Sequence, residues 1–184
     1  MKNITICMYG ASSENIDSIY LEEGNDLGKE IASRGHTLLY GGGYTGMMGA
    51  CAQGAETMNG TVIGVIPYFM DEYEGINRKC TELILTNTMA ERKELMEERA
   101  DAFVIVPGGI GTMDEFFEII TLVELEQKSA PIILFNIEGF FDPIIDFIDQ
   151  GIKKGFIREE TRKNFAVYKT ARDVVTAIEE KLFD

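Results

Sequence analysis

The stretch PGGIGTMDE, at residues 107–115, decides the fold that this sequence predicts. It follows the apolar run AFVIV, typical of a buried strand, and precedes apolar residues at helical spacing within 116–123. Strand, glycine loop and helix in this order predict a phosphate cradle, because glycines permit positive φ and close approach, and helix N-termini attract anions. The spacing matches neither the P-loop nor the G-x-G-x-x-G dinucleotide fingerprint. We therefore expect this loop to hold one phosphate, not a triphosphate.

A structural role explains the same residues on local pattern alone. Tight turns before helices also favour glycine. Thr112 followed by Glu115 matches a capping box, in which the carboxylate of Glu115 accepts a hydrogen bond from the backbone N–H of Thr112. The local sequence leaves both interpretations open, and the rest of the chain has to decide between them.

Length and composition indicate the class of protein. The 184 residues suffice for one α/β domain spanning residues 1–184. The formal net charge of −14 repels nucleic acid and anionic membrane surfaces, so we expect neither as a partner. Three separated cysteines, Cys7, Cys51 and Cys80, form no C-x-x-C pair and favour a reduced compartment. Because no apolar run is long enough for a signal peptide or a membrane span, the sequence predicts a cytoplasmic protein.

Short apolar runs separated by helical patterns predict the architecture. Besides 102–106, the expected strands are 4–9, 36–40, 61–66, 82–86, 131–135 and 165–168. Strict alternation of strand and helix predicts a Rossmann-like, doubly wound parallel sheet of about seven strands flanked by helices on both faces. Residues 68–80 are polar and irregular, and are a candidate flap.

Glycine-rich runs mark one edge of this predicted sheet. Residues 10–13, 41–49 and 107–112 all follow strands, whereas the connections at the opposite edge lack such runs. Ligands of doubly wound sheets bind at the carboxyl edge of the strands, so this asymmetry favours a ligand site over turn geometry alone. The predicted binding residues in the first two runs are Gly10, Ser12, Gly42 and Gly43.

Two charged residues are expected at the same edge. Arg92 falls near the start of the helix that follows residues 82–86, and Glu115 is expected in the first turn of the next helix. A carboxylate at a helix N-terminus is stabilised in its charged form, and a nearby arginine both holds it ionised and can bind phosphate. The alternative for Arg92 is a solvated ion pair with Glu91 or another acid of its own helix.

The motifs MAERK at 89–93 and PGGIGTMDE at 107–115 resemble the M-x-x-R-K and P-G-G-x-G-T-x-x-E pair of the Lonely Guy family. The family comprises cytokinin riboside 5′-monophosphate phosphoribohydrolases, and the resemblance covers nearly the whole chain. It implies a Rossmann-like homodimer that hydrolyses the N-glycosidic bond of a nucleoside 5′-monophosphate, giving free base and ribose 5-phosphate. It implies catalytic Arg92 and Glu115, phosphate-binding Gly108, Gly109, Gly111 and Thr112, and pocket-lining Lys93, Asp114 and Thr121.

The sequence departs from the family pattern at two places. Ala90 stands where family members often have histidine, and residues 122–124 read LVE where the family has W-A-Q. These departures bear on the identity of the base more than on the chemistry. Some apolar residues of the helix after the glycine loop, Met113, Phe116 and Phe117, are candidates for a dimer surface.

The residues also fit this chemistry independently of the resemblance. Breaking a ribosyl C–N bond builds positive charge on the sugar, which the carboxylate of Glu115 would stabilise while Arg92 neutralises phosphate or orients Glu115. We expect no metal or cofactor, since His36 and the scattered cysteines form no ligand cluster. The alternatives are an AMP nucleosidase with no cytokinin role and a non-catalytic nucleotide-binding or cofactor-carrier protein. Family members are often labelled lysine decarboxylases, but Lys93 in a charged helix does not suggest a Schiff base.

Overall fold

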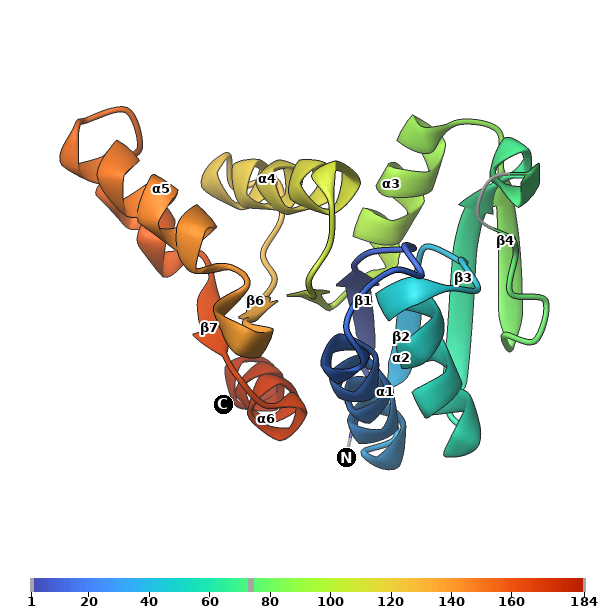
Figure 1. Ribbon diagram of the computed structural model, residues 1–184. Helices are drawn as coiled ribbons and strands as arrows, with labels where there is room; N and C mark the ends of the chain where they lie inside the picture. The colour runs from blue at the N-terminus through green and yellow to red at the C-terminus, as the bar shows by residue number, and fades with distance from the viewer. Residues whose placement is uncertain (1, 73–74, 184) are drawn as a thin grey trace.

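Seven parallel strands form one sheet in the described part of the chain, as the sequence predicts, and helices cover both of its faces (Figure 1). The computed structural model describes residues 2–72 and 75–183. The order across the sheet is β4-β3-β2-β1-β5-β6-β7, and each neighbouring pair is parallel. The strands are β1 Thr5–Tyr9, β2 Thr37–Tyr40, β3 Thr61–Pro67, β4 Glu82–Thr86, β5 Ala102–Ile105, β6 Ile132–Phe135 and β7 Ala166–Tyr168.

The helices form two layers, with α1, α2 and α6 on one face of the sheet and α3, α4 and α5 on the other (Figure 1). Their bounds are α1 Ser18–Ser33, α2 Gly46–Thr57, α3 Met89–Arg99, α4 Ile110–Glu124, α5 Asp142–Lys153 and α6 Ala171–Phe183. Within residues 2–72 and 75–183, none of the helices combines the length and apolar character needed to cross a bilayer.

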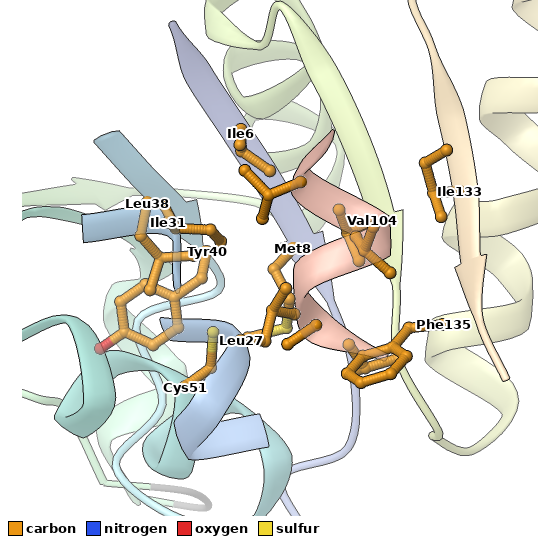
Figure 2. Packing of buried hydrophobic residues seen from close by; sticks show 14 of the residues in the cluster. Ile6, Met8, Leu27, Ile31, Leu38, Tyr40, Cys51, Val104, Ile133 and Phe135 are labelled. Atoms are coloured by element: carbon orange, nitrogen blue, oxygen red, sulfur yellow. The ribbon is translucent and has the colours of Figure 1, made fainter. Parts of the chain in front are cut away.

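Each face of the sheet buries its own apolar core, because successive strand residues point in opposite directions. Ile6 and Met8 of β1 pack on the side of α1, in the same core as Leu27, and Figure 2 shows Met8 close to Leu27. Cys7 and Tyr9 pack on the opposite side, with residues of α3 and α4. Cys7 is fully buried and is part of this second core.

The chain changes direction across the sheet between β1 and β5. Strands β2 to β4 extend to one side of β1, and β5 to β7 extend to the other. The loops that follow β1 and β5 are therefore neighbours, and the backbone N–H of Ala11 donates a 3.2 Å hydrogen bond to the carbonyl of Pro107. Such a switch point opens a crevice at the carboxyl edge, since the two crossovers diverge from it.

Glycine lets α2 pack closely enough to support the loop after β1. A Cβ on Gly28 of α1 would lie 1.9 Å from the carbonyl oxygen of Cys51, so the two helices touch through backbone. At the N-terminus of α2, Gly46 has φ +62°, and a side chain there would strike the carbonyl of Ala11. The N–H of Met48 donates to that same carbonyl at 3.1 Å, which fixes the loop against the helix.

The expected flap is more regular than predicted. Tyr68–Glu72 is a 3-10 turn, and Ile76 forms an antiparallel bridge with Gly43, which ties the segment to the loop after β2. The backbone N–H of Asn77 also donates to the carbonyl of Gly42 at 2.9 Å. Residues 73–74 of the expected flap lie outside the described residues.

Candidate functional site

A cavity of about 280 Å³ opens at the switch point, at the edge where the sequence predicts a ligand. Its polar side is formed by the loop after β1 and by the start of α4. Its apolar side comes from α2, the end of β3, the 3-10 turn that follows β3 and the start of α3, and the residues there are Met48, Ile66, Pro67, Met70 and Met89. The cavity therefore has one end suited to an anion and another suited to an apolar group.

Most of the predicted site residues line this cavity. They are Arg92, Lys93, Gly109, Gly111, Thr112, Asp114, Glu115, Gly10 and Ser12. The topology explains why they meet: Gly10 and Gly109 follow adjacent strands, whereas Arg92 and Glu115 lie near the starts of helices that begin at the same edge.

The remaining predicted residues have other positions. Gly42 has φ +75° and, like Gly43, holds the segment around residues 76–77 through its backbone. Thr121 lies farther along α4, where its hydroxyl donates to the carbonyl of Phe117 at 2.7 Å. It lines a separate concavity of about 220 Å³ that includes Phe156, so in this chain Thr121 does not face the main cavity.

The glycines of the central loop are not there for backbone conformation. Glycine permits positive φ, but residues 108–111 do not use it: among the described glycines with positive φ, none belongs to this stretch, and Gly109 has φ −89°. Gly108 is required by packing, because a Cβ there would lie 2.1 Å from Oγ1 of Thr112. By contrast, a Cβ on Gly109 or Gly111 would meet nothing within 4 Å. Neither strain nor packing therefore requires glycine at 109 or 111, and the backbone there is open to the approach of a ligand.

The capping-box interpretation of Thr112 and Glu115 is also wrong. Gly109 is the N-cap residue of α4 and makes no side-chain cap, so the helix starts inside the glycine run at Ile110. Glu115 consequently lies in the second turn, not the first as predicted. Its carboxylate turns toward α3 and does not bond the N–H of Thr112.

Arg92 and Glu115 form a buried ion pair between α3 and α4. Nη1 of Arg92 lies 2.8 Å from Oε1 of Glu115, and each side chain is 9% exposed. Nε of Arg92 donates to the carbonyl of Val65 at 3.2 Å. The alternative of a solvated pair with Glu91 is therefore wrong, because Glu91 instead accepts from the N–H of Asn87 at 2.8 Å beside the cap of α3.

Two atoms of this pair remain free for a ligand. Oε2 of Glu115 and Nη2 of Arg92 have no hydrogen-bond partner among the residues that the structure describes. A Cβ on Gly41 would lie 2.4 Å from Nη2, so the guanidinium fits only because Gly41 has no side chain. Sequence reasoning missed this role of Gly41, although its place directly after β2 gave the signal.

Burial raises the pKa of Glu115 above its ordinary range, and the charge and hydrogen bond of Arg92 partly offset this effect. The prediction that the helix N-terminus keeps this carboxyl strongly ionised is therefore corrected. Desolvation outweighs it, because Glu115 lies beyond the first turn where the helix dipole acts. Arg92 is the main group that favours the charged form of Glu115, and the charge of Lys93 adds a smaller effect in the same direction.

Lys93 lines the cavity, but its ammonium group pairs with acids of α4. Nζ lies 3.1 Å from Oδ2 of Asp114 and 2.6 Å from Oε2 of Glu118. The close ion pair with Glu118 is the main cause that raises the pKa of Lys93. A lysine that forms a Schiff base needs a lowered pKa, so this environment is unlike that of such a lysine. Residues 2–72 and 75–183 also contain no cluster of three or more His, Cys, Asp or Glu that could hold a metal ion.

Comparison with known proteins agrees with the sheet and its motifs. The family model described as "Possible lysine decarboxylase" matches residues 48–178. The cytokinin riboside 5′-monophosphate phosphoribohydrolase LOG of Oryza sativa subsp. japonica is 38% identical over 175 residues, covering 95% of this chain and 72% of the rice protein. The phosphoribohydrolase LOG3 of Arabidopsis thaliana is 35% identical over 175 residues, covering 95% of this chain and 81% of its own.

Solved structures share the architecture at lower identity. The molybdenum cofactor carrier protein from Chlamydomonas reinhardtii gives a TM-score of 0.74 at 22% identity, with 100% of both chains covered. The molybdenum cofactor binding protein from Rippkaea orientalis gives 0.73 at 19% identity, with 99% of both covered. The fold, with its cavity at the switch point, is that of a Rossmann-like α/β protein. The match to the family model and the identity with the plant proteins show that this chain belongs to the Lonely Guy family.

Replacing Arg92 by methionine should destabilise the protein in a pH-dependent way. The substitution leaves the Glu115 carboxyl buried without its partner, so we expect the free energy of unfolding to fall by about 3–5 kcal/mol at about pH 8. Without Arg92 the folded-state pKa of Glu115 rises further above its unfolded value. The folded variant tolerates the protonated carboxyl better than the charged one, so its stability falls as pH rises. The difference from the wild type in the free energy of unfolding should therefore shrink toward about pH 5. Urea denaturation of the variant and the wild type at both pH values measures this difference in the free energy of unfolding.

Arg99→Met is the matched control on the same helix. Arg99 pairs with Glu82 at 3.1 Å, and both side chains are more than a third exposed, so its loss should cost no more than about 1 kcal/mol. An Arg92→Met deficit of equal size at both pH values would contradict the role of the buried charge.

Proposed function

We propose that this protein hydrolyses the N-glycosidic bond of cytokinin riboside 5′-monophosphate or a related purine nucleoside 5′-monophosphate, releasing the free base and ribose 5-phosphate. The observation that carries the proposal is the buried Arg92–Glu115 pair, which lies in one cavity with the open glycines of α4. The rice and Arabidopsis relatives are named as phosphoribohydrolases of this kind, which supports the same reaction.

The start of α4 is the phosphate end of the proposed site. The first N–H groups of a helix have no intrahelical partner and point outward, so those around Gly111 and Thr112 can donate to phosphate oxygens. The open space at Gly109 and Gly111 lets an anion reach the backbone. Binding energy from this remote phosphate would hold the sugar in position over the reacting groups.

The ion pair supplies the chemistry at the sugar. As the C–N bond breaks, positive charge builds on the ribose, and Oε2 of Glu115 can stabilise it and orient the attacking water. The free Nη2 of Arg92 can donate to the substrate, while Nη1 keeps Glu115 oriented and favours its charged form. The reaction in this form needs no metal ion and no cofactor.

The apolar end of the cavity fits the base. Its side chains are aliphatic or thioethers, and methionine adapts to the shape of an apolar partner. Such a wall accepts a purine with an apolar substituent, and it offers no strong side-chain hydrogen bond to the exocyclic groups of the base. Release of adenine from AMP, compared with release of N6-isopentenyladenine from its ribotide, separates a cytokinin enzyme from an AMP nucleosidase.

A non-catalytic carrier is the second candidate, because the molybdenum cofactor proteins share the fold. Their identity of 19–22% supports only the architecture. The desolvated carboxyl beside an open phosphate loop favours turnover over simple carriage, since perturbed acids in clefts are typical of catalytic sites.

Glu115→Gln should abolish base release while the fold stays intact. The amide keeps the shape of the side chain but cannot carry the charge that stabilises the ribosyl cation, so we expect kcat to fall by at least about 100-fold. Chromatographic assay of free base measures the effect, with circular dichroism as the check on folding. Unchanged turnover in this variant would remove Glu115 from the reaction.

Gly109→Val should weaken substrate binding with only a modest loss of stability, about 1 kcal/mol, from the poorer N-cap residue of α4. A Cβ at this position meets no protein atom within 4 Å, so the added side chain projects into the space proposed for phosphate. We expect KM to rise by about tenfold or more, with a melting temperature close to that of the wild type. A large loss of stability together with normal KM would mean that the glycine serves the fold.

The chain should act as a cytoplasmic homodimer formed by single-domain protomers of residues 1–184. Phe117, Phe147 and Phe156 expose apolar surface near α4 and α5, and Phe156 is 87% exposed. Of the residues named as a dimer surface from sequence, Met113 is half-buried and Phe116 belongs to the core. Sedimentation should give twice the mass of the 20.5 kDa chain, and a monomer at all concentrations would refute the dimer.

The charge and the cysteines support the remaining parts of the proposal. With a net charge of −14, neither nucleic acid nor an anionic membrane is a favoured partner. Cys7 and Cys51 are buried free thiols, as expected in a reducing cytoplasm.

A further inference from the structure

Two neighbouring ion pairs join α3 to α4. Arg92 and Lys93 are consecutive on α3, and Asp114 and Glu115 are consecutive on α4. The inner pair is the buried contact of Arg92 with Glu115. The outer one, here called the lysine bridge, runs from Nζ of Lys93 to Asp114 at 3.1 Å and to Glu118 at 2.6 Å.

The ammonium of Lys93 is committed to this bridge. Its side chain is 19% exposed, and Glu118, its nearer partner, does not line the cavity. Its pKa is raised first by the close ion pair with Glu118 and then by the hydrogen bond with Asp114. The charged ammonium of Lys93 is therefore stabilised by its contacts with α4, unlike that of a lysine that is free to bind phosphate.

The contact between α3 and α4, here called the seam, gathers several acidic side chains, and Lys93 supplies positive charge to it. Glu97 lies one turn beyond Lys93 on α3, and its pKa is raised to about 7 by burial and by the charge of Glu118. Lys93 and Lys128 both oppose that shift. Lys128, however, uses its Nζ to bind the carbonyls of Glu97 and Ala100 at 2.6 and 2.9 Å, which holds the end of α3. Lys93 alone among these groups bonds side chains of both Asp114 and Glu118 across the seam.

We propose that Lys93 is a positioning residue: its bridge to Glu118 sets the spacing of α3 and α4, so that Arg92 meets Glu115 in the productive geometry. The inference rests on the proposed hydrolase function and deepens it. Arg92 is anchored to the carbonyl of Val65 on β3, so a shift of α4 changes the distance from Arg92 to Glu115 directly. Displacements of about 1 Å at a catalytic group cost up to about 100-fold in rate.

The test compares Lys93→Met, Glu118→Gln and the double variant in steady-state base release. We expect each single variant to lower kcat by about tenfold with KM changed less than about twofold, because positioning acts on the transition state. The double variant should be no slower than Lys93→Met, because both changes break the same contact. Lys93→Arg should recover part of the lost rate.

The matched control is Arg99→Gln, which breaks the exposed pair with Glu82 on the same helix and should leave kcat and KM unchanged. A readout independent of turnover is the side-chain Nε–H signal of Arg92 in nitrogen-15 spectra. It should shift in Lys93→Met and Glu118→Gln but not in Arg99→Gln.

The possible outcomes distinguish failure of the lysine-bridge proposal from failure of the proposed hydrolase function. If Lys93 instead touches phosphate, Lys93→Met raises KM while Glu118→Gln keeps normal kinetics, and the proposal is overturned. An active wild type with an unperturbed Arg92 signal in Glu118→Gln also overturns it. A wild type that releases no base from any nucleoside monophosphate refutes the hydrolase, whereas the Arg92 signal still reports whether the bridge orders the pair.

Discussion

The site depends on one contact, the desolvated ion pair between Arg92 and Glu115. Taking each charge out of water costs roughly several kcal/mol, so such a pair persists only where geometry and extra hydrogen bonds offset the cost. The carbonyl of Val65 and the bare backbone of Gly41 meet that need on the arginine side. On the other side, α4 presents the carboxylate from its second turn. The pair is possible because two crossovers begin at the same edge of the sheet.

The sheet was predictable because its strands are short apolar runs that alternate strictly with helical patterns. The run at 102–106 has no polar side chain to face water on either side, which is the signature of a parallel strand covered by helices. Once the strands were placed, the carboxyl-edge rule brought residues 10–13, Arg92 and the glycine loop together. The same rule predicts that Arg92 and Glu115 lie close together, because both are near the starts of helices that begin there, and the structure shows that they pair.

The sequence predictions that were wrong concern details that tertiary contacts decide. The glycine run reads as a loop that ends before a cap at Thr112, yet α4 starts at Ile110 because Gly109 itself serves as the N-cap residue. The direction of the pKa shift of Glu115 depends on burial by neighbours distant in sequence, which no local motif contains. Met48 and Met70 lie at the apolar end of the cavity for the same reason, since separate crossovers carry them there.

The residues that line the cavity come from only one part of the chain. Among the described residues, those that face it all lie between Gly10 and Glu115, so β6, β7, α5 and α6 contribute none. The C-terminal third is held to the rest by the two cores and by the network in which Arg34 and His36 contact Glu179 of α6. The two parts therefore affect the cavity in different ways: side chains of the first line it directly, whereas those of the second act on it only through packing. A substitution after residue 124 can thus change the shape of the cavity only by shifting the sheet or the helices that carry its lining.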